Sequence, residues 1–205
     1  RALLDAITAG KASARLIQDS AVDVRLALSG LENYKARASE LLKGLPAADA
    51  RVNSEIERRK QGLLGDRSDL TRGAVAFEKH CGACHQVRGK GGRVGPQLDG
   101  VGVRGPDRLL EDLLDPSRNV DQAFRTTNLA LKDGRVVSGL LLREEGEVLV
   151  VADSQGREVT VPKAEVEQRS VVPLSPMPAN IVDQIPAEEF PHLLGFLLSQ
   201  AEAVR

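Results

Sequence analysis

The 205-residue chain has few aromatic residues, few cysteines and no long apolar stretch. It contains no tryptophan, one tyrosine and four phenylalanines, so a flat apolar cofactor would usefully add to its core. Its apolar runs are far shorter than the roughly 20 residues that a transmembrane helix needs. With 28 basic and 29 acidic residues the net charge is −1, so no overall field favours nucleic acid or a membrane surface. The length suits one large or two small domains.

Both cysteines lie within five residues, Cys81-Gly82-Ala83-Cys84-His85. The pattern C-x-x-C-H is typical of c-type haem attachment. The spacing lets both thiols reach one porphyrin edge and add across its vinyl groups, and it leaves His85 under the iron. The sequence therefore predicts one covalently attached haem c, with Cys81 and Cys84 as attachment residues and His85 as a metal ligand.

Two other kinds of site use such a cysteine pair. A thioredoxin-like redox pair needs a strand before the motif and a helix after it, whereas here a helical pattern precedes and a glycine-rich loop follows. A structural zinc site needs four ligands, so the cysteines would have to recruit His85 with His80 or His192. No zinc-finger spacing supports that set.

The glycine-rich loop after the motif holds three further candidate haem-binding residues. Pro96 keeps a carbonyl that can accept the Nδ1–H of His85, and such a bond orients a ligating imidazole and raises its basicity. Leu98 is expected to line the haem edge. Arg104 is a candidate donor to a haem propionate, with a solvated loop arginine as the equal alternative. Basic residues in and beside the loop, Arg88, Lys90 and Arg93, are a candidate docking patch for an acidic partner, or simply a soluble loop.

Met177 is the chain's single methionine. A lone methionine is usually core filler, but this one lies between two prolines in the segment Pro173–Pro178. Thioether sulfur is an established axial partner of histidine in electron-transfer cytochromes. We therefore expect Met177 to be the second metal ligand. The rival histidines are His80, which is too close to the attachment site, and His192, which lies within the last helix.

Hydrophobic periodicity predicts helices on both sides of a strand-rich segment. Residues 1–70 should be a helical linker or repeat-like region, with an ambiguous stretch at 16–28, and residues 71–205 should form the domain that carries the motif. In that domain we expect a sheet at about 126–172, read as a meander of three to five strands with Asp133-Gly134 as a hairpin turn. An apolar stripe ending at Gly10 predicts a first short helix. Further helices are predicted at about 36–42, 52–64, 71–79, 106–114 and 186–203, and Pro191 is tolerable only in the first turn of the last one, so its regular part can begin after residue 186.

The pattern resembles class I cytochrome c over residues 71–114 and 173–203. That resemblance implies a haem plate between three main helices, with histidine and methionine as axial ligands. The expected fold is therefore mainly α: a class I cytochrome c fold with an inserted small antiparallel sheet and an N-terminal helical extension. The matching positions are Gly73, Phe77, Cys81–His85, Gly95–Leu98 and Leu194–Phe196.

The combination with the strand-rich segment is similar to a narrower group, the Pirellula/Verrucomicrobium-type haem-binding domain. The similarity spans residues 68–205 and implies an electron-accepting module at the C-terminus of a larger exported, dehydrogenase-like protein. Its motifs recur in order at Gly100–Arg104, Leu113–Arg118, Lys132–Arg135 and Ser175–Pro178.

These patterns predict an electron carrier rather than an enzyme, with a redox protein or a fused dehydrogenase domain as partner and no nucleic acid. The alternative is a haem-based gas or redox sensor, or a peroxidase-like site, with a labile distal ligand. A third possibility is an interaction module with haem as structural core. The chain starts at Arg1 without a signal pattern and reads as a mature or excised piece. Because c-type attachment takes place outside the bacterial cytoplasm, we expect a periplasmic or otherwise exported protein.

Overall fold

The computed structural model describes residues 2–9, 17, 33–43, 48–63 and 68–201. Within it the chain divides into two compact units, Arg1–Ser54 and Glu55–Arg205. The domain boundary expected between residues 70 and 71 stays a prediction. Among the described residues, no helix has the length and apolar character needed to cross a bilayer.

The first unit is helical where it is described. It contains α1 (Ala2–Thr8) and α3 (Tyr34–Leu42), joined by an ion pair between Arg37 and Asp5 at 2.8 Å. The long helix α4 (Ala48–Leu63) begins in this unit and ends in the second. The stretch 16–28 lies outside the described residues, apart from Ile17.

The second unit contains three helices, α5 (Leu70–His80), α6 (Gly105–Leu114) and α7 (Phe190–Ser199), and the cysteine motif directly follows α5. The side chain of Asp69 caps α5 by accepting from the N–H groups of Thr71 and Arg72, which satisfies donors that a helix start leaves unpaired. Proline stands in the first turn of both α6 and α7, where its missing N–H costs nothing. The last helix begins at Phe190, which places Pro191 in its first turn, as the proline predicts.

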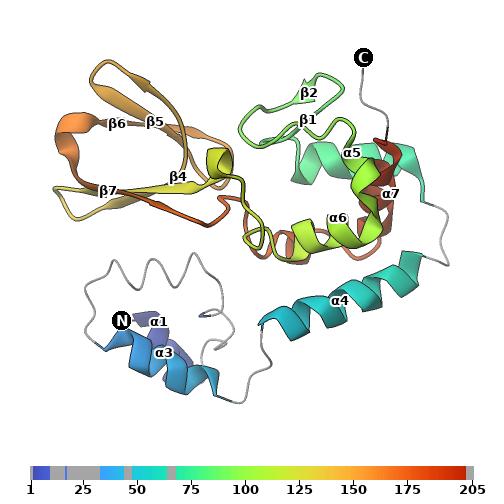
Figure 1. The fold of residues 1–205 in the computed structure, drawn as a ribbon, viewed down its shortest axis with the longest axis horizontal. Helices are drawn as coiled ribbons and strands as arrows, with labels where there is room; N and C mark the ends of the chain where they lie inside the picture. Colours follow the sequence, from blue (N-terminus) through green and yellow to red (C-terminus); the bar gives the residue numbers. More distant parts are fainter. Residues whose placement is uncertain (1, 10–16, 18–32, 44–47, 64–67, 202–205) are drawn as a thin grey trace. The chain divides into compact units, whose positions relative to one another are not determined.

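Helices α5 and α7 cross (Figure 1), and Gly73 lies where they meet. A Cβ on Gly73 would lie 2.2 Å from the carbonyl oxygen of His192 and 2.6 Å from Cβ of Phe196, so only glycine permits this approach. Beside the crossing, the rings of Phe77 and Phe196 lie 5.6 Å apart.

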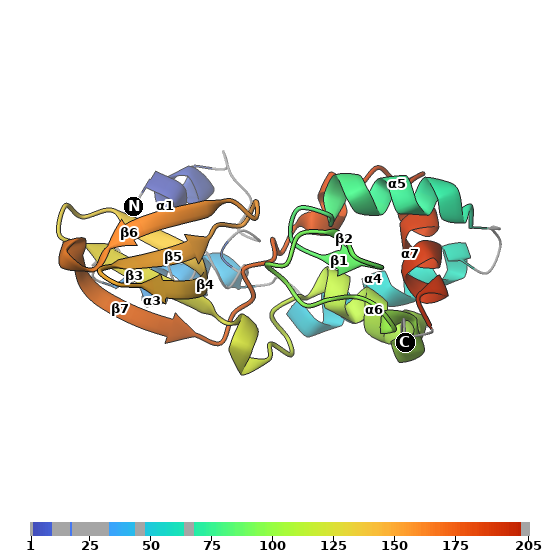
Figure 2. The ribbon, with the colours of Figure 1, turned by 90° about the horizontal axis from the view of Figure 1, so that it is seen from above.

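The inserted segment forms one five-stranded antiparallel sheet (Figure 2). Its spatial order is β6-β5-β4-β3-β7, and a register shift between Leu141 and Arg143 interrupts the pairing of β4 with β5. The predicted turn at Asp133-Gly134 joins β3 and β4, with Gly134 at φ +84°. The strands are β3 (Thr126–Leu131), β4 (Val136–Glu145), β5 (Val148–Ala152), β6 (Glu158–Pro162) and β7 (Val166–Val172).

The sheet overturns the expectation of a mainly α fold. It has a buried core of its own, made by Leu129, Leu131, Leu149, Val151 and Val161, so it is a full structural layer and not a small appendage. The described part of the chain is therefore α+β. The expected meander was also wrong in its last step, because β7 pairs with β3 and not with β6. Periodicity within a strand carries no information about such a non-local partner.

Short elements connect these parts. Two residue pairs in the glycine-rich loop make a small antiparallel ladder, β1 (Gln86–Val87) with β2 (Lys90–Gly91). Single 3-10 turns lie before α6, before β3, before β7 and before α7. They are η2 (Val101–Arg104), η3 (Gln122–Phe124), η4 (Lys163–Glu165) and η5 (Ile181–Gln184).

Candidate functional site

Helix α5 delivers the cysteine motif and the chain turns at once. Cys81 is the C-cap of α5, and its N–H donates to the carbonyl of Phe77 at 2.8 Å. The N–H groups of Cys84 and His85 then donate back to the carbonyl of Cys81, at 3.1 and 2.9 Å. These bonds wind residues 81–85 into a single tight turn, which holds both thiols and the imidazole close to the end of the helix.

The glycine-rich loop wraps around this turn at backbone distance. Cβ atoms at Gly91 and Gly92 would lie 2.1 Å from the carbonyl oxygens of His85 and Ala83, respectively. The N–H of Gly92 donates to the carbonyl of Gly82 at 2.8 Å. The glycines are therefore required by close packing of the loop on the motif.

The imidazole of His85 is held by one hydrogen bond. Its Nδ1 lies 2.9 Å from the carbonyl oxygen of Pro96, and because a carbonyl only accepts, Nδ1 must carry the proton. Nε2 is then the free lone pair. Burial lowers the pKa of His85, against the opposing effect of the Pro96 bond, so the ring is neutral at pH 7. The bond expected from the sequence is present, and it leaves a neutral imidazole with its metal-binding nitrogen available.

The two thiols are both free and differ in exposure. Cys81 is 9 % exposed, and burial raises the pKa of its thiol to about 12. Cys84 is half-buried; burial and, secondarily, the charge of Asp153 raise the pKa of its thiol. Neither is activated as a redox thiolate, which low-pKa cysteines are. No group of three or more potential metal-ligating residues occurs in the described part of the chain, so the zinc interpretation gains no support.

The residues present fit a covalently attached haem. Two unpaired thiols precede an imidazole whose Nε2 is free. Gly95 lies against the face of that ring, and its lack of a side chain leaves room for the ring. A Cβ on Gly95 would lie 2.6 Å from Cε1 and 2.9 Å from Nδ1 of His85. This donor set suits porphyrin attachment and iron ligation.

Replacing Gly95 by alanine is expected to displace the His85 ring, because the new methyl group would overlap it. The φ of Gly95 is not positive, so the effect would be steric and would weaken the bond to Pro96. We expect a shifted reduction potential and a free energy of unfolding that is lower by about 1–3 kcal/mol. A lower midpoint of thermal unfolding would report this loss of stability. Pro96→Ala is the control, because it keeps the carbonyl acceptor. Equal behaviour of the two variants would contradict this account.

Met177 lies in a segment whose backbone is hydrogen-bonded just before it. Before it, the carbonyl of Leu174 accepts from the N–H and the hydroxyl of Thr126, at 2.8 and 3.0 Å. The N–H of Ser175 donates to the hydroxyl of Ser117 at 3.2 Å, and the N–H of Met177 donates to that of Ser175 at 3.1 Å. The side chain is half-buried. These bonds fix the backbone around Met177, and its role as a ligand stays a prediction.

Both rival histidines are engaged elsewhere. Nδ1 of His192 accepts from the N–H of Asp69 at 3.1 Å, at the start of α5. Nε2 of His80 lies 3.0 Å from Glu189, whose carboxylate also pairs with Lys79 at 3.2 Å. His80 and Lys79, in that order of effect, lower the pKa of Glu189. His192 of α7 binds Asp69, the residue before α5, and His80 of α5 binds Glu189, the residue before α7. Both histidines therefore link the ends of the two helices, which is a structural role.

The other two candidate residues, Arg104 and Leu98, have partners within the protein. Arg104 pairs with Asp112 of α6 at 2.6 Å, so its guanidinium already has a carboxylate within the protein. Burial raises the pKa of Asp112 although Arg104 and Arg108 oppose this. Leu98 is half-buried, and its N–H donates to the carbonyl of Gln86 at 2.9 Å. Contact of either residue with haem stays a prediction.

One part of the site was missed by the sequence reasoning. The turn between β5 and β6 reaches the motif: a Cβ on Gly156 would lie 3.0 Å from Sγ of Cys84. The Ser-Gln-Gly pattern signals a hairpin turn and nothing about its neighbours, because the contact depends on how the sheet packs. Residues 153–157 therefore belong to the site only through tertiary structure.

Comparison with known proteins agrees with this geometry. Residues 70–145 match the family model Cytochrome c, a segment that contains α5, the motif and its glycine-rich loop and ends in β4. No curated protein matches the chain. The match supports a cytochrome c family for this part of the chain, and with it covalently bound haem c and a function in electron transfer.

Proposed function

We propose that the chain is a mono-haem c-type cytochrome domain that carries single electrons and is not itself an enzyme. The observation that supports this most directly is the hydrogen bond from Nδ1 of His85 to the carbonyl of Pro96, at a histidine that directly follows two free cysteines. A bound haem would supply a reversible one-electron iron couple. The protein would contribute attachment, an oriented ligand and a surface for partners.

Each residue of the site has a separate task. The thiols of Cys81 and Cys84 would add S–H across two vinyl groups, which needs no oxidant and leaves two thioether bonds. His85 would bind iron through Nε2, because Pro96 holds the proton on Nδ1. Met177 would fill the opposite position, which favours electron exchange over binding of a substrate or gas.

The wider setting is also a proposal. The order of motifs from Gly100 to Pro178 supports the Pirellula/Verrucomicrobium-type subgroup. In that setting the domain would accept electrons from a dehydrogenase-like part of a larger protein or from a separate redox protein. Covalent attachment of haem supports a periplasmic or otherwise exported location.

Optical spectroscopy of the purified protein tests the function. We expect haem absorbance that survives denaturation and extraction, because thioether bonds are covalent, and a reversible titration between two redox states. Colour that is extracted by acidified solvent would refute covalent attachment. Irreversible redox behaviour would refute the electron-carrier function.

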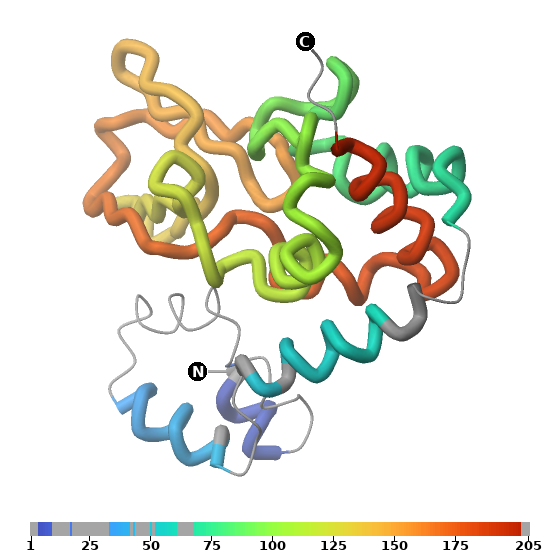
Figure 3. Tube along the Cα trace, turned by 45° about the vertical axis from the view of Figure 1, so that its right-hand side comes forward, coloured from blue at the N-terminus to red at the C-terminus, as the bar shows by residue number. Residues whose placement is uncertain are grey.

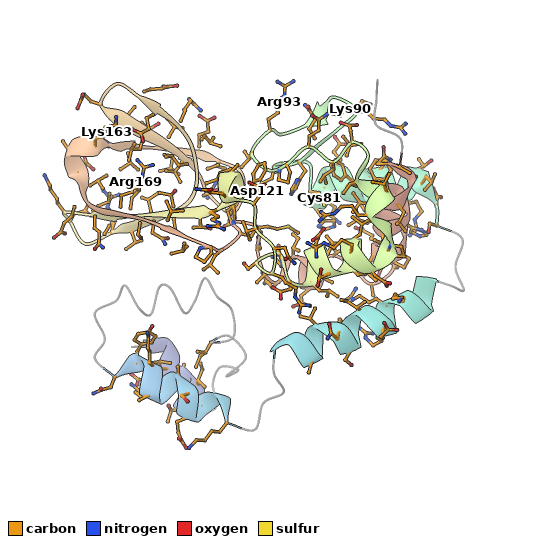
Figure 4. All side chains as sticks on the ribbon, in the orientation of Figure 1. Cys81, Lys90, Arg93, Asp121, Lys163 and Arg169 are labelled. Carbon is orange, nitrogen blue, oxygen red and sulfur yellow. The ribbon has the colours of Figure 1, made fainter. Side chains whose placement is uncertain are left out.

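The basic residues beside the motif, Arg88, Lys90 and Arg93, are proposed to steer an acidic partner. All three are exposed, and Lys90 and Arg93 project from the loop that carries β1 and β2 (Figure 4). Reversing the three charges is expected to slow electron transfer to an acidic redox protein several-fold at low salt. The difference should shrink at 1 M salt, where the Debye length is about 3 Å. Stopped-flow rates across a salt series measure both effects.

The control reverses three basic residues of the sheet, Lys132, Arg135 and Arg169, which changes the net charge equally. This control is expected to leave the rates closer to those of the parent protein. Rates that respond equally to both sets of substitutions would show a general charge effect and no docking patch.

A further inference from the structure

The turn between β5 and β6, residues 153–157, contacts the cysteine motif from outside the cytochrome-like helices. A Cβ on Gly156 would lie 2.9 Å from the carbonyl oxygen of Ala83 and 3.0 Å from Sγ of Cys84. Figure 3 shows this turn beside the loop that continues from the motif. The inserted sheet thus reaches the haem-attachment residues at backbone distance.

The turn is internally fixed. The carboxylate of Asp153 accepts from the N–H groups of Gln155 and Arg157, at 2.8 and 3.0 Å. Its second oxygen accepts from the guanidinium of Arg157, at 2.8 and 2.9 Å. The N–H of Gly156 donates to the carbonyl of Asp153 at 2.9 Å, and its φ is +76°. A turn built this way keeps its shape without the motif, so its position against Cys84 results from packing of the sheet.

The contact falls on the more open of the two attachment residues. Cys81 is buried under α5, whereas Cys84 is half-buried and has the turn against its sulfur. The carbonyl of Ala83 is approached from both sides, by Gly92 of the motif's own loop and by Gly156 of the sheet. The sheet therefore adds cover at Ala83 and Cys84 to that given by the motif's own loop.

We propose that the Asp153–Arg157 turn is a cap on the Cys84 side of the haem site. It excludes water from the thioether at Cys84 and prevents redox partners from approaching the porphyrin edge there. The inference rests on the proposed function, because without haem the turn would cover only a thiol. It assigns the inserted sheet a role at the redox centre, where burial is one of the factors that set the potential.

A packing contact without a redox role is the alternative, and a matched pair of variants separates the two. Gly156→Asn adds a side chain against Ala83 and Cys84, and asparagine tolerates a positive φ, so the strain of the turn itself stays small. Gly134→Asn is the control: it lies in another turn of the same sheet, at φ +84°, and no atom within the described structure beyond its neighbours lies within 4 Å of a Cβ there.

The holoproteins are compared by redox titration and by the rate of oxidation with a small neutral quinone. In Gly156→Asn we expect a lower potential, because water stabilises the more highly charged ferric state, and a several-fold faster oxidation. Gly134→Asn should match the parent in both measurements. The thermal midpoint of each variant reports the loss of stability separately.

Identical potentials and rates in Gly156→Asn and the parent protein would overturn the cap. So would equal changes in the two variants, because the effect would then follow from the sheet's stability. A parent protein without covalent haem would instead refute the proposed function, and the cap with it. A haem-containing parent whose Gly156→Asn variant behaves like Gly134→Asn would refute the cap alone.

Discussion

Replacing Met177 by leucine is expected to remove the near-infrared absorption that a sulfur–iron(III) bond produces. Leucine nearly preserves the volume of methionine and should preserve packing, at a cost below about 1.5 kcal/mol. Without the thioether the reduction potential should fall by on the order of 0.1 V, since axial ligands control haem potentials over a wide range. The reduced variant should also bind carbon monoxide, which the parent protein should resist.

The reason for choosing Met177 is the way its segment is held. The bonds of Thr126 to Leu174 and of Ser117 to Ser175 fix the backbone just before the proposed ligand. Leu174→Ala is a control that changes a neighbouring apolar side chain and keeps the sulfur, so its near-infrared band should remain. If the parent protein lacks the band, or if its carbon monoxide binding equals that of Met177→Leu, Met177 is not the ligand.

Replacing Gly73 by valine is expected to cost about 3 kcal/mol or more of stability. The added atoms would overlap the carbonyl of His192, which is backbone and cannot rotate away, and Cβ of Phe196. Helix propensity alone would stabilise the variant by less than about 1 kcal/mol. The steric cost is larger, so the substitution should lower stability overall. Cys81 directly follows α5. Moving α5 away from α7 should therefore move the haem-attachment residues and shift the reduction potential.

Chemical denaturation and redox titration of the holoprotein measure the two effects of Gly73→Val. Val75→Ala is the matched control on the same helix, because Val75 is 62 % exposed and exposed substitutions usually change stability by less than about 0.5 kcal/mol. A Gly73→Val protein as stable as the control would mean that α5 and α7 do not pack through this glycine.

The local elements were largely predictable because each has a signal within its own residues. Asp133-Gly134 specified the first hairpin, and hydrophobic periodicity placed the starts of α5 and α6 within one residue. The bond from His85 to Pro96 was predictable because the two residues are only 11 positions apart and Pro96 offers a carbonyl acceptor. These features depend on neighbours that lie within about a dozen positions.

Features that depend on distant partners were not predictable in the same way. His192 appeared only as a rival ligand, although its ring accepts the N–H of Asp69, 123 residues away. The contact of Gly156 with Cys84 had no sequence signal, because it depends on how a whole sheet packs against a helical domain. The same limit led to the mainly α expectation.

The closure of the inserted sheet also bears on how the chain can fold. Met177 follows His85 by 92 residues, a long loop to close for two groups that would meet at one iron. Thr126 and Leu174, which are 48 residues apart, are joined by hydrogen bonds at the base of the sheet. Once β3 and β7 have paired, about half of the intervening chain no longer contributes to the loop, which lowers the closure entropy cost by about 0.6 kcal/mol. Once the sheet has formed, the insertion therefore adds almost nothing to the entropy cost of bringing Met177 to His85.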